Sequence, residues 1–189
     1  MTCRIAINGY GRIGQSILRA AYERRSKGAS NNAFNIVAIN ELSDIETISY
    51  LTRYDTTHGR FPLNVDIASS TQLKVSDDYI SVYRNESLID LPWEKEEVDL
   101  VMECTGAFNT RAEVGQHIQA GSPRVLLSQP ADIHVDKTVV YGVNHTCMTF
   151  ADQVVSNASF TSNAIVPIIK ILDSAFGIVH GTLNTIHSA

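Results

Sequence analysis

The chain has 189 residues, of which 44% are hydrophobic and 19% are charged, and its formal net charge is -5. This size and composition indicate a soluble globular protein with one domain, or one domain and part of another, and argue against disorder. Lysine and arginine are scattered rather than clustered, which argues against a nucleic-acid-binding surface, and no run approaches the roughly 18 apolar residues of a membrane span.

The first half of the chain alternates short apolar strands with helical patterns, as parallel sheets with crossover helices do. "RIAIN" (4–8) and "NIVAIN" (35–40) are predicted strands. Between them, Ile13, Ile17 and Ala20 recur at helical spacing, and a polar loop is expected over 26–34. These elements predict a Rossmann-type, doubly wound, mostly parallel α/β sheet.

Capping signals place two further helices. Ser43 and Glu46 have the spacing of a capping box, as do Thr110 and Glu113, and Gly121 is expected to end the second of these helices. The remaining strands of the sheet are predicted at 98–104, 124–128, 138–143 and 153–159.

The C-terminal stretch differs from the rest of the chain. Residues 162–176 are apolar nearly all round and stop at Gly177, which predicts a helix that needs burial on most sides. Residues 178–188 are predicted to form a strand with an exposed edge. We therefore expect an α/β domain over 1–157, followed over 158–189 by a helix and a strand of a different character.

The cysteines and the N-terminal residues indicate the compartment. Cys3, Cys104 and Cys147 are odd in number and lack CxxC spacing, so we expect buried free thiols rather than a disulfide framework or a metal site. The start, "MTCRIAING", lacks the basic and apolar regions of a signal peptide. A cytoplasmic location is the expectation.

A glycine-rich loop is the most informative motif. Gly9, Gly11 and Gly14 in "NGYGRIG" form G-x-G-x-x-G between the first strand and the first helix. Such glycines permit a tight turn, a close approach of a pyrophosphate and close packing of helix on strand, and the helix N-terminus favours the phosphate charge. The motif in this position predicts a dinucleotide site.

Glu41 follows the second strand. An acidic side chain there accepts hydrogen bonds from the adenosine ribose and repels the extra phosphate of NADP, so NAD is the predicted cofactor. The spacing from the glycines exceeds the usual ~20 residues, and the polar loop at 26–34 accounts for the excess. The alternative is an exposed acid that simply follows a strand.

Several stretches in order resemble one family. They are "INGYGRIG", "AINEL", "YDTTHGRF", "CTGAF", "VVYGVN", "VSNAS" with "TSN", and "TIHSA". The chain is similar in these to the phosphorylating glyceraldehyde-3-phosphate dehydrogenase superfamily, and closest in "AINELSDIETISYLTRYDTTHGRF" and "TIHSA" to its erythrose-4-phosphate dehydrogenase branch. The match covers the first half or so of a typical family member, and family members are commonly tetramers. The resemblance thus implies an NAD-binding Rossmann domain over 1–157 and the beginning of an incomplete catalytic domain over 158–189.

The resemblance implies roles for individual residues. Pyrophosphate contacts are implied for Gly9, Gly11, Arg12, Ile13 and Gly14, ribose contacts for Glu41, and other cofactor contacts for Thr105, Gly106 and Ser128. Ser159 and Thr161 correspond to residues that bind substrate or inorganic phosphate, and His187 to the general base. The family oxidises a sugar-phosphate aldehyde through a cysteine thiohemiacetal that passes hydride to NAD and leaves a thioester.

Phe160 stands where the family has that nucleophilic cysteine. A phenyl ring has no lone pair to attack a carbonyl, so covalent catalysis through this position is excluded and His187 has no thiol to activate. Glu86 likewise stands where the family has an arginine near the adenine. Cys104 is the remaining thiol near the cofactor, but nothing in the sequence places its sulfur at the substrate.

Alternatives stay open for the residues around Phe160 and for the whole chain. Ser159 and Thr161 suit a helix cap and turn as well as phosphate binding, and His187 suits a structural role. The chain can be part of an NAD-dependent aldehyde dehydrogenase, which we expect to be inactive because Phe160 replaces the nucleophile, or an NAD-binding module without catalysis. A third hypothesis is a self-associating domain that buries the apolar helix in a homo-oligomer.

Overall fold

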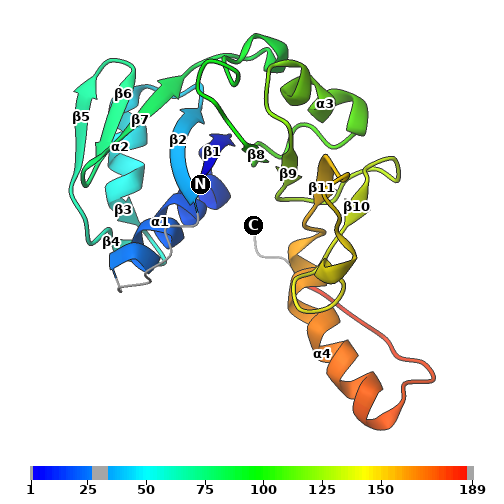
Figure 1. The fold of residues 1–189 in the computed structure, drawn as a ribbon. Coiled ribbons are helices and arrows are strands. Elements are labelled where there is room, and N and C mark those ends of the chain that lie inside the picture. Colours follow the sequence, from blue (N-terminus) through cyan, green and yellow to red (C-terminus); the bar gives the residue numbers. More distant parts are fainter. Residues whose placement is uncertain (1, 27–33, 187–189) are drawn as a thin grey trace.

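The computed structural model describes residues 2–26 and 34–186, and its centre is one nine-stranded sheet in the order β10-β11-β9-β8-β1-β2-β7-β6-β5 (Figure 1). The strands from β10 to β7 pair in parallel, whereas β7, β6 and β5 pair antiparallel. This confirms the predicted mostly parallel α/β sheet. The strands of this sheet are β1 (Cys3–Asn8), β2 (Phe34–Asn40), β5 (Val65–Ser69), β6 (Gln72–Val75), β7 (Asp78–Tyr83), β8 (Leu100–Glu103), β9 (Val125–Leu127), β10 (Lys137–Thr138) and β11 (Val154–Ser156).

Helices lie on both faces of this sheet. The elements outside it are α1 (Arg12–Ser26), α2 (Ile45–Arg53), α3 (Arg111–Gln119), α4 (Phe160–Phe176), the short 3-10 helices η1 (Leu88–Asp90) and η2 (His145–Cys147), and a small sheet of β3 (Tyr54–Asp55) and β4 (Gly59–Arg60). None of the helices in the described ranges has the length and apolar character needed to cross a membrane.

Alternation along the central strands divides the core between the two faces. In β1, Ala6 belongs to a cluster around the fully buried Trp93, whereas Ile7 belongs to a cluster with Leu18 of α1 and Ile48 of α2. Successive strand residues point to opposite faces, so one strand supplies both clusters. A third cluster packs α3 on β9 and β11 through Val114, Val125, Leu127 and Val154. The middle of the sheet is thus fixed from both sides.

The start of α2 corrects one predicted cap. Asp44, not Ser43, is the N-cap, because its side chain accepts a hydrogen bond from the Thr47 amide at 2.6 Å. The backbone amide and hydroxyl of Ser43 both donate instead to Glu41, each at 3.3 Å. The other predicted capping box, Thr110 with Glu113, is confirmed at α3.

The C-terminal part corrects two predicted strands. Of the predicted strand 138–143 only Thr138 pairs, as the second residue of β10, and the chain turns at Gly142, whose φ is 81°. No strand forms over 178–186, although 178–188 was the predicted range; no neighbouring strand lies in the described residues to pair with it. The apolar helix is confirmed and ends at Gly177 with φ 71°. It extends away from the sheet, and the segment after it runs back along it (Figure 1).

Candidate cofactor-binding site

A cavity of about 470 Å³ opens at the carboxyl ends of the central parallel strands. Its walls come from residues at or after the ends of β1, β2, β7 and β8, namely Asn8, Gly9, Gly11, Asn40, Glu41, Leu42, Asn85, Glu86, Leu88, Cys104, Thr105, Ala107 and Phe108. From β1 the chain first adds β2 on one side of the sheet and later adds β8 on the other side, so the direction in which strands are added reverses at β1. Ligands of open α/β sheets bind outside the strand ends at such a switch point. The predicted dinucleotide site therefore coincides with a cavity.

Gly9 makes the turn out of β1 possible. Its φ is 86°, and a Cβ on it would lie 2.6 Å from the Thr105 amide nitrogen and 2.7 Å from the Thr105 Cα. The loop after β1 thus packs backbone to backbone on the loop after β8. Only glycine combines this left-handed conformation with this close approach.

Gly11 and Gly14 serve the loop in different ways. A Cβ on Gly14 would lie 2.4 Å from the Gly9 carbonyl oxygen, so this glycine lets α1 start directly against the turn. A Cβ on Gly11 would meet no protein atom within 4 Å, and Gly11 lines the cavity. The space beside Gly11 is therefore available to a ligand, next to the first α1 amides, which have no partner within the helix.

Glu41 is built into the cavity wall by the glycine loop. Its Oε2 accepts a hydrogen bond from the Tyr10 amide at 2.8 Å, and its Oε1 accepts the two bonds from Ser43. The carboxylate therefore has a fixed place in the cavity rather than swinging free in solvent. Glu86 lines the same cavity, so two acidic residues border the space expected for the cofactor.

Three asparagines in the wall were not predicted. Asn8 and Asn40 are nearly fully buried at the ends of β1 and β2, and Asn40 Nδ2 donates to Asn8 Oδ1 at 2.7 Å. The backbone amide of Asn85, after β7, donates to Asn40 Oδ1 at 2.9 Å, while Asn40 Nδ2 also donates to the backbone carbonyl oxygen of Asn85. The signal was present as the repeated "AIN" at 6–8 and 38–40, where a polar residue ends each apolar strand.

The other predicted cofactor residues lie around the cavity without lining it. Arg12 and Ile13 form the first turn of α1, and Gly106, with φ 77°, follows the cavity residue Thr105. Ser128 follows β9, and its amide donates to the Glu103 carbonyl oxygen at 3.0 Å. Their contacts with a cofactor stay predictions.

Phe160 is the first residue of α4, and its side chain is 62% exposed. Ser159 is the N-cap: its hydroxyl accepts from the Ser162 amide at 2.9 Å and is 2.8 Å from the Ser162 hydroxyl. Thr161 lies in the first turn. The capping alternative therefore holds for Ser159, and phosphate binding stays a prediction. His187, the predicted base, lies outside the described residues, as does most of the predicted loop 26–34.

Cys104 does not replace the missing nucleophile. Burial raises the pKa of its thiol to about 12, opposed by a hydrogen bond with Ser128 and assisted by the neighbouring Glu103 carboxylate. The thiolate is the reactive form of cysteine. All three cysteines are free, but the expectation that all are buried is wrong, because Cys147 is exposed on η2.

These environments predict selective alkylation. With a pKa of about 12, Cys104 is thiolate in only roughly one part in ten thousand at pH 8, so iodoacetamide should modify Cys147 and spare Cys104 in the folded chain. Raising the pH should speed the Cys104 reaction, because more thiolate forms as the pH nears its pKa. Peptide mapping by mass spectrometry measures both rates. Equal rates at pH 8 would contradict the assignment.

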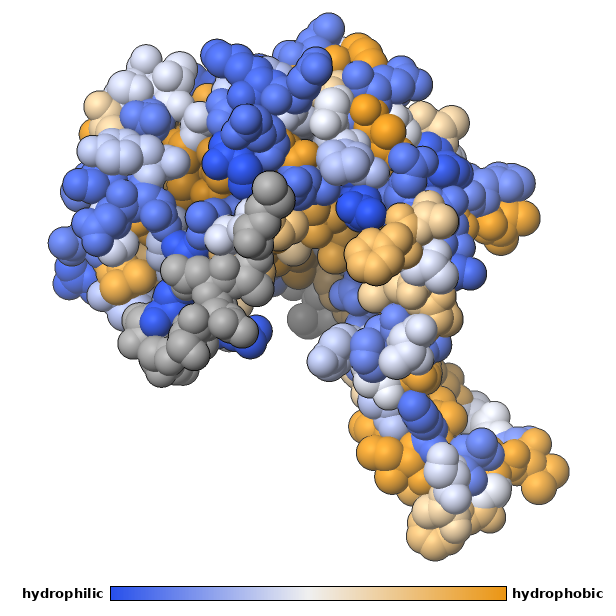
Figure 2. All heavy atoms as spheres, viewed as in Figure 1, coloured by the Kyte–Doolittle hydropathy of each residue, from blue (hydrophilic) through white to orange (hydrophobic). Residues whose placement is uncertain are grey.

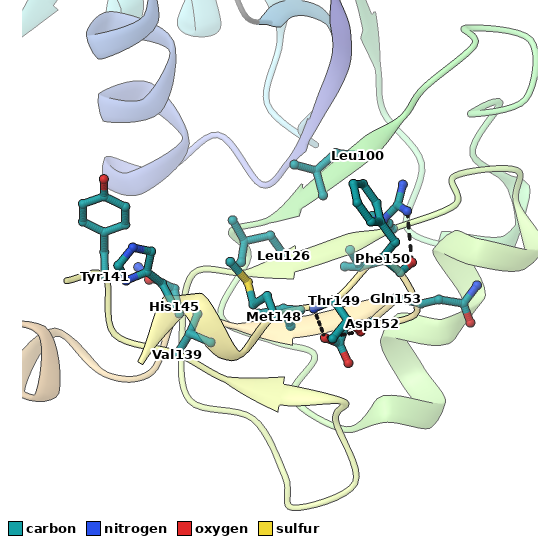
Figure 3. A pocket seen from close by; sticks show the side chains of 14 residues that line it. Leu100, Leu126, Val139, Tyr141, His145, Met148, Thr149, Phe150, Asp152 and Gln153 are labelled. Atoms are coloured by element: carbon teal, nitrogen blue, oxygen red, sulfur yellow. Dashed lines mark hydrogen bonds between the residues drawn. The ribbon is translucent and has the colours of Figure 1, made fainter. Parts of the chain in front are cut away.

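A second, larger cavity of about 610 Å³ shares no lining residue with the first. It lies over β8, β9 and β11, where Leu100, Leu126, Met148 and Phe150 form an apolar wall and Tyr141 stacks near His145 (Figure 3). It contains no glycine loop and few charged groups. In the described part of the chain, no group of three or more His, Cys, Asp or Glu side chains is arranged to hold a metal ion.

Comparison with protein families agrees with the geometry of the first cavity. The model of the glyceraldehyde 3-phosphate dehydrogenase NAD binding domain matches residues 3–111, more than half of the chain. This range spans the glycine loop, Glu41 and Thr105, and the open space beside Gly11 suits a pyrophosphate. The chain therefore belongs to the family of the glyceraldehyde 3-phosphate dehydrogenase NAD-binding domain, an oxidoreductase family, and NAD is its cofactor.

Proposed function

We propose that this chain is the NAD-binding part of a sugar-phosphate aldehyde dehydrogenase, and that as written it binds NAD without covalent catalysis. One contrast carries the proposal. The glycine loop is complete and opens on a cavity of about 470 Å³, while the position of the nucleophile holds the exposed Phe160. The partly buried thiol of Cys104, with its pKa of about 12, offers no substitute.

Different residues of the cavity bind different parts of NAD. The first amides of α1 face the pyrophosphate beside Gly11, where the helix dipole favours negative charge. Glu41 accepts hydrogen bonds from the adenosine ribose hydroxyls, and Leu88 and Phe108 give the base an apolar wall. When bound, NAD supplies the hydride-accepting nicotinamide. An added ribose phosphate would face both Glu41 and Glu86, which favours NAD over NADP.

The proposed substrate class in the family is a phosphorylated sugar aldehyde, with erythrose 4-phosphate preferred to glyceraldehyde 3-phosphate. The stretch from "AINELSDI" to "THGRF", together with "TIHSA", supports this branch. Three free cysteines fit a reducing compartment, so we place the protein in the cytoplasm.

Two measurements on the folded chain test the proposal. Calorimetry should show saturable NAD binding and at least about tenfold weaker NADP binding, because repulsion of about 1.4 kcal/mol corresponds to that ratio. Assays with erythrose 4-phosphate and glyceraldehyde 3-phosphate should give no NADH above a blank. No binding at millimolar NAD would reject the binding function, and turnover would reject the loss of catalysis.

A second candidate function is self-association, because α4 contains no buried residue although it is largely apolar. Figure 2 shows these apolar residues gathered over the extended helix. We infer that α4 is covered in a homo-oligomer, which is compatible with NAD binding.

A further inference from the structure

A carboxylate behind the cofactor cavity has four hydrogen-bond donors and no contact with solvent. Glu103, the last residue of β8, is fully buried. Its Oε1 accepts from the Thr105 amide at 2.8 Å and from the Thr105 hydroxyl, and its Oε2 accepts from Asn8 Nδ2 at 2.6 Å and contacts His117 Nε2 at 3.0 Å. Both oxygens of Glu103 therefore act as hydrogen-bond acceptors.

The histidine on this carboxylate is fixed in one tautomer by a tryptophan. Trp93 Nε1 donates to His117 Nδ1 at 2.9 Å, and an indole N–H is a donor only. The proton of a neutral His117 therefore lies on Nε2 and points at Glu103. The contact is a hydrogen bond from a neutral imidazole rather than an ion pair. Trp93, His117 and Glu103 are all fully buried, so the orientation is locked by packing as well.

From Glu103 the hydrogen bonds continue into the cavity wall. Asn8 accepts from Asn40, and Asn40 exchanges two bonds with the backbone of Asn85. Asn8, Asn40, Asn85 and Thr105 all line the cavity and belong to the ends of β1, β2, β7 and β8. One buried carboxylate is thus connected to all four loops that form the site.

We propose that Glu103 is the positioning residue of the NAD cavity: it holds the loops after β1 and β8 in register with each other, and through Asn8 those after β2 and β7. The proposal rests on the proposed NAD binding. Glu103 does not line the cavity, so it acts through Asn8 and Thr105 rather than by touching NAD. A buried network of this kind is favourable only while every member is satisfied.

Glu103→Gln is the direct test, because glutamine has the same shape but replaces one acceptor oxygen with an NH₂ donor. In either orientation of the amide, this NH₂ group meets other donors, either those of Asn8 and His117 or those of Thr105. The Kd for NAD, measured by calorimetry, should rise at least about tenfold. Tyr22→Phe is the matched control: it removes the hydrogen bond from Tyr22 to Asp78, away from the cavity, and should leave the Kd within about twofold.

A double-mutant cycle separates positioning from a general loss of structure. Thr105→Val removes the hydroxyl that donates to Glu103, whereas Thr105→Ser keeps it. Thr105 is exposed, so both variants should fold. Thr105→Val should raise the Kd about threefold or more and Thr105→Ser should restore it. In the Glu103→Gln background, Thr105→Val should raise the Kd for NAD by a clearly smaller factor than it does alone, because the Glu103 carboxylate that Thr105 binds is already gone.

The outcomes distinguish the two proposals. If the unaltered chain fails to bind NAD, the proposed function is wrong. If it binds NAD and folded Glu103→Gln binds equally well, or if the two effects simply add, Glu103 is not the positioning residue. If Glu103→Gln does not fold, the pair at Thr105 decides: equal affinity of the Val and Ser variants overturns the proposal.

Discussion

Gly11→Ala is expected to weaken NAD binding strongly while leaving the folded chain as stable as before. The new methyl group meets no protein atom within 4 Å, so the free energy of unfolding should change by less than about 0.5 kcal/mol. The same methyl would occupy the space in which backbone approaches the pyrophosphate. Losing one or two charge-assisted hydrogen bonds of about 1.5–3 kcal/mol each corresponds to a rise in Kd of at least about tenfold.

Gly9→Ala is the informative comparison for this variant. Its methyl group would lie 2.6–2.8 Å from backbone atoms of Cys104 and Thr105, and the left-handed φ of 86° adds strain. We expect a loss of at least about 2 kcal/mol of stability together with weaker NAD binding. Thermal unfolding and calorimetry on both variants measure the two effects. If Gly11→Ala binds NAD normally, the pyrophosphate does not lie beside Gly11.

Polar substitution of α4 is expected to change the assembly of the protein. Ile171 and Phe176 are 69% and 83% exposed on a helix without a buried residue. Large exposed apolar patches mark interaction surfaces, so the unaltered chain should be larger than its 20.8 kDa monomer mass in solution. Replacing both residues with glutamate should yield a monomer with unchanged NAD affinity, because neither residue lines the cofactor cavity.

Ile133→Glu provides the control for charge alone. Ile133 is 92% exposed but lies in the loop before β10, apart from α4, so the variant should associate like the unaltered chain. Multi-angle light scattering at several concentrations gives the mass of each. A monomeric unaltered chain across that range would show that α4 is not covered by a second copy.

Local patterns carried much of the prediction. The strand, loop and helix around Gly9 are confirmed because turn chemistry and helical periodicity act within about 20 residues of sequence. The cap at Thr110 and the stop at Gly177 are local in the same sense. The predicted cap at Ser43 was wrong because the Ser43 hydroxyl donates to the nearby Glu41 carboxylate instead of capping the helix.

Features that depend on distant partners were not predictable in this way. The strand expected over 178–188 had a suitable pattern, but a strand needs a neighbour, and residues 178–186 have none. The asparagines of the cavity and the contact of Glu103 with His117 join side chains from separate elements. A polar residue ending an apolar strand indicates such a site, but only the sheet order shows which polar ends meet.

The turn before α4 has a consequence for redesign. Ala158 is buried with φ 56°, a left-handed conformation that costs a residue with a Cβ about 1–2 kcal/mol. Its amide donates to the Ser156 hydroxyl at 3.1 Å, which holds the turn and places residue 160 at the head of the helix. This conformational cost falls on Ala158 and does not depend on which side chain stands at residue 160. New chemistry at residue 160 would therefore require an exchange of atoms on one exposed side chain and no rebuilding of the main chain that carries it.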